Sequence, residues 1–123
     1  MPNRYTNEET IVDKNEVREN LAEFIDDNDR VTVYRGEHIS TDSFVSRPMH
    51  LASSFTIDYK VAKFFATRAC VGTANIYTLS LPLNKIAWYT DERNESEVIV
   101  PPLGKSYTKY LLNIEQISLE PET

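Results

Sequence analysis

Residues 94–100 read Asn-Glu-Ser-Glu-Val-Ile-Val and join two carboxylates to the start of an apolar strand. Side chains of an extended chain alternate between two faces, so Glu95, Glu97 and Ile99 share one face while the two valines point to the other. One such carboxylate can hold a substrate while the other handles a nucleophile. A pair of acids at this spacing is by itself more often a solvated strand edge than a catalytic site. Its meaning therefore depends on the rest of the chain.

A second strand carries an arginine on its apolar face. Residues 31–37 read Val-Thr-Val-Tyr-Arg-Gly-Glu, and alternation puts Val31, Val33 and Arg35 together. A buried guanidinium is costly unless an anion pairs with it. Gly36 has no side chain, so the backbone there can approach a ligand closely. The strand therefore predicts an anion, from the protein or from a ligand, next to Arg35.

A third segment runs from an extended Ser-Phe-Thr at 54–56 into an amphipathic helix predicted at 58–69. The apolar positions at helical spacing are Val61, Ala62, Phe64, Phe65 and Ala69.

These three segments, in this order, resemble the mono-ADP-ribosyltransferases of the Arg-Ser-Glu class, the group with cholera-toxin-like, arginine-specific members. The family has three motifs, and this chain matches them across residues 31–102. The aromatic-Arg-Gly motif is matched by Tyr34-Arg35-Gly36, and the Ser-Thr-Ser-like triplet before a Val-Ala-x-x-Phe helix is matched by Ser54-Phe55-Thr56 with the helix after it. The Glu-x-Glu pair is matched by Glu95-Ser96-Glu97. The triplet departs from the family at Phe55, which removes a polar group, and at Thr56, which keeps a hydroxyl.

The resemblance implies an α+β fold in which two small, mostly antiparallel β-sheets pack face to face with few flanking helices. NAD, the co-substrate, would bind in the cleft between the sheets. Glu97 would hold the ribose 2′-hydroxyl and stabilise the cationic transition state. Glu95 would orient or deprotonate the attacking group. Ser54 would hydrogen-bond Glu97 and fix its rotamer.

The resemblance also assigns groups to the rest of NAD. Arg35 would pair with the diphosphate, which suits a guanidinium fork. The backbone of Gly36 would contact the nicotinamide amide, and Thr56 and Phe65 would belong to the NAD site. At helical spacing, Phe65 is also explained as an ordinary core residue. In the loop before Glu-x-Glu, Tyr89 is the candidate for substrate recognition, whereas Trp88 is expected to pack.

The expected activity is the transfer of ADP-ribose from NAD to an acceptor, with a protein arginine favoured because the first acid of Glu-x-Glu is glutamate. The alternatives are an NAD glycohydrolase, a nucleic-acid ADP-ribosyltransferase and a non-catalytic binding module with the same fold. Net charge −6 disfavours passive binding to a nucleic-acid backbone. No metal site is expected, because His38 and His50 lack partners at metal-ligand spacing.

The 123 residues predict one minimal catalytic domain, with residues 1–12 and 120–123 loose. The sequence has no long apolar run and no signal-peptide pattern, so we expect a protein that works in a cytoplasm, its own or that of a target cell into which it is delivered. Cys70 is the single cysteine, which suits a reducing compartment, and is expected to be a small core residue.

Outside the three motifs, the pattern predicts a helix from Asp13 to the acidic stretch 26–29, with Val17, Leu21, Phe24 and Ile25 on one face. Strands are predicted at 31–35, 49–55, 74–81, 84–89, 97–101 and 107–119, the last with a bulge near 115–116.

Overall fold

The computed structural model describes residues 14–39, 49–68, 72–91 and 96–119. The predictions for the two termini, Ala69 and Cys70 fall outside these ranges. The fold is α+β, with one six-stranded antiparallel sheet in the order β4-β5-β2-β1-β3-β6 and few helices. The elements are α2 (Lys14–Asn20), β1 (Arg30–Ile39), β2 (Ser54–Thr56), α3 (Tyr59–Thr67), β3 (Gly72–Pro82), β4 (Trp88–Thr90), β5 (Glu97–Ile99) and β6 (Leu111–Leu119).

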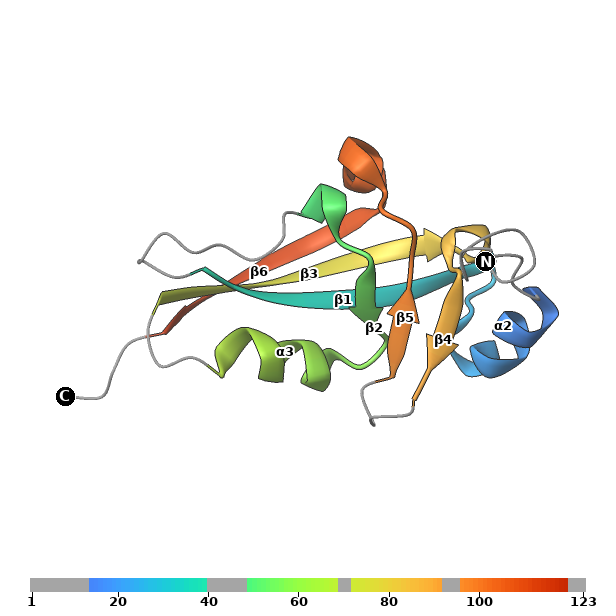
Figure 1. Cartoon of the computed structure of the whole chain (residues 1–123), viewed down its shortest axis with the longest axis horizontal. Coiled ribbons are helices and arrows are strands. Elements are labelled where there is room, and N and C mark those ends of the chain that lie inside the picture. Colours follow the sequence, from blue (N-terminus) through green and yellow to red (C-terminus); the bar gives the residue numbers. More distant parts are fainter. Residues whose placement is uncertain (1–13, 40–48, 69–71, 92–95, 120–123) are drawn as a thin grey trace, which may run out of the picture.

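The α+β class and the antiparallel pairing are confirmed, but the sheet is continuous where two packed sheets were expected. Strands β1, β3 and β6 are long and pair over most of their length. In contrast, β1 meets β2 through a single residue pair, Tyr34 opposite Thr56. Figure 1 shows the short strands β2, β5 and β4 inclined steeply to the long ones. The sheet therefore bends sharply at this one pair.

The bend allows the two parts of the sheet to enclose a common core. Apolar residues from the long strands meet apolar residues from the short strands and from α2 in one buried cluster. Its largest fully buried members are Val17, Leu21, Val31, Val33, Leu79, Leu81, Ile86, Val98 and Val100. Burial of this set is the main favourable contribution to folding, at about 1.5–3 kcal/mol for each large side chain.

Helix α3 packs on the other face of the long strands, as Figure 1 shows. Asp58 caps it, because its side chain accepts a hydrogen bond from the backbone of Lys60 at 2.9 Å. Ala62 and Ala66 lie in a second buried cluster with two residues of β3. Their small side chains bring the helix close to the sheet. Phe64 was predicted on the buried face, but 63% of its surface is exposed, since the contact is made by the alanines one turn apart.

The N-terminal helix is shorter than predicted. Val17 and Leu21 are buried, but the chain tightens into a 3-10 helix at Ala22–Phe24, where the amide of Phe24 donates to the carbonyl of Leu21 at 2.7 Å. The tighter winding turns Phe24 outward, so it is 43% exposed instead of buried. Ile25 is half-buried and still packs against the core.

Several strand predictions were wrong at their ends. Part of each predicted strand at 49–55, 84–89 and 107–119 is a 3-10 helix, at Met49–Leu51, Leu83–Lys85 and Gly104–Lys109. The bulge in β6 lies near Leu112 instead of 115–116, because the register with β3 shifts where Thr78 faces Asn113 and Leu79 faces Leu111. Within the described ranges, no helix has both the length and the apolar character needed to cross a bilayer.

Candidate active site

A cleft of about 460 Å³ opens beside the place where β1 and β2 separate, and α3 forms one of its walls. Its volume is in the range of small-molecule pockets, roughly 300–1,000 Å³. Residues of β1, β2, α3 and β5 line it: Tyr34, Arg35, Gly36, Glu37, His38, Ser54, Phe55, Thr56, Val61, Ala62, Phe65, Arg68 and Glu97. The cleft therefore brings together all three sequence motifs.

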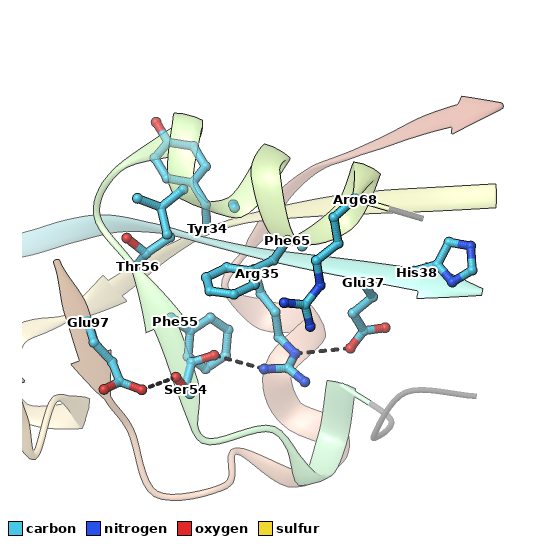
Figure 2. Close-up of a pocket in the computed structure, with 13 residues that line it drawn as sticks. Tyr34, Arg35, Glu37, His38, Ser54, Phe55, Thr56, Phe65, Arg68 and Glu97 are labelled. Carbon is cyan, nitrogen blue, oxygen red and sulfur yellow. Dashed lines mark hydrogen bonds and ion pairs between the residues drawn. The ribbon is translucent and has the colours of Figure 1, made fainter. Parts of the chain in front are cut away.

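One end of the cleft holds Ser54 and Glu97. In the antiparallel pair β2–β5, Glu97 lies opposite Thr56 and Ser54 lies opposite Ile99, so these side chains share a face. The hydroxyl of Ser54 donates a hydrogen bond to Oε2 of Glu97 (Figure 2). A carboxylate held in this way has a fixed rotamer and a second oxygen for a ligand.

The turn before Glu97 is also braced. Ser96 has a positive φ of 48°, which is uncommon outside glycine. Its amide donates to the carboxylate of Asp91 at 3.0 Å, and its carbonyl accepts from the amide of Ile57 at 3.1 Å. These contacts set the position at which the chain enters β5.

Arg35 projects into the middle of the cleft and has a protein anion as its partner. Its Nε donates to Oε2 of Glu37 at 3.0 Å, and its Nη1 donates to the backbone carbonyl of Ser54 at 2.9 Å. The guanidinium thus ties β1 to β2 beyond their single backbone pair. It also fixes the residue whose hydroxyl holds Glu97.

Glu37 was not selected from the sequence as a site residue. Its side chain is only 7% exposed, and it extends the alternation of Val31, Val33 and Arg35 by one more step. That alternation is the signal that could have found it, because a glutamate two residues after a buried arginine lies on the same face. Burial raises the pKa of the Tyr77 phenol, and the negative charge of Glu37 raises it further.

Helix α3 contributes an aromatic residue to the cleft, and its C-cap residue, Arg68, contributes a cation. Phe65 lines the cleft, and the guanidinium of Arg68 lies over its ring, 5.0 Å from the centroid. Figure 2 shows the Arg68 side chain extending toward Arg35 and Glu37. Arg68 was also missed, although its place one turn after Phe65 puts both side chains on one side of the helix.

Gly36 and Thr56 lie in the cleft lining, and each also has a structural role. A Cβ on Gly36 would lie 2.0 Å from the carbonyl oxygen of Ala62, so glycine is required for α3 to pack this closely. The hydroxyl of Thr56 accepts a hydrogen bond from the amide of Asp58 at 3.0 Å. This contact shapes the turn between β2 and α3.

Tyr89 does not line the cleft. It lies opposite buried Val98 and packs against the core, whereas Trp88 is 39% exposed and lies opposite Ile99, on the face that carries Glu97. Trp88 was predicted to pack and Tyr89 to contact the substrate, but strand alternation turns Tyr89 toward the core and leaves Trp88 exposed. Glu95 falls outside the described residues, and its role stays a prediction.

Among the residues that the structure describes, no three His, Cys, Asp or Glu side chains gather in a way that could hold a metal ion. Comparison of the chain with models of protein families, with curated proteins and with solved structures gave no match.

Proposed function

We propose that the protein is an NAD-dependent mono-ADP-ribosyltransferase that works through the Arg-Ser-Glu cleft. The observation that carries the proposal is the pair formed by Ser54 and Glu97 at one end of a cleft that also holds Arg35. Three motifs that are far apart in sequence supply these groups, and each has the residue type that the chemistry of NAD requires. The finer fold proposed with this function is the family's two-layer arrangement, which the sharp bend between β1 and β2 supports.

Glu97 is proposed as the catalytic carboxylate. When the bond between C1′ of the ribose and the nicotinamide nitrogen breaks, its electron pair leaves with nicotinamide and the ribose becomes an oxocarbenium-like cation. A carboxylate beside that cation lowers the barrier. Ser54 is proposed as a positioning residue, because it occupies one oxygen of Glu97 and leaves the other for the ribose 2′-hydroxyl.

The middle of the cleft is proposed to bind the diphosphate of NAD. Arg35 and Arg68 are both cationic and both line the cavity, and guanidinium groups suit phosphate oxygens. Phe65 also lines the cleft, and its ring is proposed to contact a planar ring of the ligand. The ligand would lie along the cleft, with its reacting bond near Glu97.

The acceptor is proposed to be a protein arginine. Its guanidinium nitrogen would attack C1′ and lose a proton, which Glu95 would accept. Trp88 is proposed to contact the acceptor in place of Tyr89, because it is the exposed aromatic on the Glu97 face.

The test is to incubate the protein with NAD, with and without agmatine, and to measure nicotinamide release and ADP-ribosyl-agmatine together. We expect both products in the presence of agmatine. Release of nicotinamide without transfer to agmatine or to any protein in a lysate would indicate an NAD glycohydrolase. Absence of both nicotinamide release and transfer would contradict the proposal and favour a non-catalytic binding module.

A substitution of Glu95 separates transfer from hydrolysis. Glu95→Gln is expected to lose transfer to agmatine and to retain slow hydrolysis of NAD, because water needs less help with its proton than a guanidinium does. Equal loss of both activities would assign Glu95 to the NAD side of the reaction. Unchanged transfer would remove the reason for favouring arginine.

A further inference from the structure

The charges around the cleft include one carboxylate that the proposed reaction does not use. Two guanidinium groups, those of Arg35 and Arg68, and two carboxylates, those of Glu37 and Glu97, line the cavity. Glu97 belongs to the reacting end. Glu37 belongs to the end that is proposed to receive the diphosphate, where a negative charge opposes binding. A buried carboxylate at this end is therefore expected to weaken anion binding unless a cation neutralises it.

The contacts of Arg35 show how Glu37 is neutralised. Glu37 occupies Nε at 3.0 Å and the carbonyl of Ser54 occupies Nη1 at 2.9 Å. Within the described part of the chain, Nη2 is the guanidinium nitrogen that has no such contact, and Figure 2 shows it on the side away from Ser54. The fork of Arg35 is thus already in use, and its charge is cancelled by a partner that is 7% exposed.

We propose that Glu37 is a positioning residue that competes with the ligand's anionic group for Arg35. It holds the guanidinium as a brace between β1 and the carbonyl of Ser54, and it keeps the affinity of the cleft for phosphate groups low. The anion is then bound mainly by Arg68 and by the remaining nitrogen of Arg35. Identifying the anion as the diphosphate of NAD rests on the proposed function; the competition itself does not.

The direction of the effect follows from electrostatics. A carboxylate within a few ångströms of a bound phosphate repels it, and the repulsion is strong where protein atoms exclude water. Removing that charge while keeping a hydrogen-bond acceptor for Nε should tighten anion binding. A residue with a purely structural role would show the opposite, because its loss would distort the site and weaken binding.

The experiment measures pyrophosphate binding by calorimetry in the wild-type chain of 123 residues and in its Glu37→Gln variant. Glutamine keeps an oxygen for Nε but carries no charge, so we expect binding on the order of tenfold tighter than in the wild type. The matched control is Glu23→Gln, which makes the same change in net charge at an exposed position on a helix remote from the cleft. Its pyrophosphate affinity should equal that of the wild type.

Unchanged or weaker pyrophosphate binding in Glu37→Gln would overturn the inference. If this variant does not fold, Glu37→Met, which is similar in volume and uncharged, takes its place with the same expected direction. Failure of the proposed function is seen separately, as absence of nicotinamide release from NAD by the wild type. A tighter complex with pyrophosphate in the variant supports the competition in either case.

Discussion

The two ends of the cleft are built in different ways. At the Glu97 end, the register of two neighbouring strands puts Ser54 and Glu97 on one face, and a single hydrogen bond completes the arrangement. At the other end, charged groups from strand β1 and from the C-cap of helix α3 converge: Arg35 pairs with Glu37, and Arg68 lies over the Phe65 ring. The geometry of the first end, which we propose as the reaction centre, is set by strand register. The affinity of the second, which we propose as the anion-binding part, should depend on the balance of its charges.

The largest expected effect comes from a substitution that alters only the Glu97 end of the cleft. Glu97→Gln should reduce nicotinamide release from NAD by about a hundredfold or more, because the transition state loses its carboxylate. The neutral amide still accepts the Ser54 hydrogen bond, so the melting temperature and the affinity for ADP-ribose should stay close to the wild type. Release measured by chromatography, with Glu23→Gln as the control, gives the result. Near-normal release would remove Glu97 from the chemistry.

A second change disturbs both ends together. Gly36→Ala puts a methyl group 2.0 Å from the carbonyl oxygen of Ala62, so α3 must move away from β1. We expect a loss of stability of about 1–3 kcal/mol, typical of overpacking, together with weaker NAD binding. Gly104→Ala is the control: its φ of +65° makes alanine unfavourable, but open space surrounds it and it lies outside the cleft lining. It should lower stability and leave NAD affinity unchanged. Equal NAD affinities in the two variants would contradict the proposed close packing.

A third change weakens the second end alone. Arg68→Gln should lower NAD affinity by about tenfold, the scale of one charge-assisted hydrogen bond, with little change in the melting temperature because Arg68 is exposed. The rate constant of nicotinamide release at saturating NAD should change much less than KM. Arg18→Gln, an exposed arginine on α2, provides the matched control. A fall in the rate constant with unchanged KM would reverse the assignment of the two ends.

Much of the Glu97 end could be predicted from the sequence, because it depends on local rules. Alternation aligned Glu97 with Ile99, and the Ser-Phe-Thr triplet that carries Ser54 led into the predicted helix. These inferences need only the geometry of an extended strand and the spacing of a helix.

The other end could be predicted less well, because periodicity does not reveal which turn of a helix faces a cavity. Periodicity alone did not distinguish the adjacent apolar residues Phe64 and Phe65, and only the family resemblance singled out Phe65. Phe65 lines the cleft, whereas Phe64 is exposed. Which of Trp88 and Tyr89 points toward the core depends on the β4–β5 register, which is a long-range pairing. Glu37 was within reach of simple alternation, but the predicted strand ended at Arg35, so the alternation was not extended to it.

The smallest expected effect concerns the stability that an exposed ion pair remote from the cleft contributes. Arg18 donates to both oxygens of Asp29, at 2.7 and 2.9 Å, and this contact lowers the pKa of the Asp29 carboxyl. A carboxyl whose pKa is lowered by folding stabilises the fold at pH values above its pKa in the unfolded chain, about 3.9. This contribution disappears as the pH falls through the lower pKa of the folded state.

The Arg18→Gln variant should therefore melt about 2 °C or less below the wild type at pH 7, since both groups are exposed. The difference should vanish near pH 2, and thermal melts at both pH values check this. A larger loss at pH 2 than at pH 7 would contradict the assigned sign.

The single residue pair between β1 and β2 also has a consequence for dynamics. Few backbone hydrogen bonds connect the strand that carries Arg35 to the strand that carries Ser54, so this line is a place where the sheet can open locally without global unfolding. Backbone amides of β2 should then exchange with deuterium sooner than those in the middle of β3. A ligand that spans the cleft touches both sides of this line, and it should slow exchange in β2 more than anywhere else in the sheet.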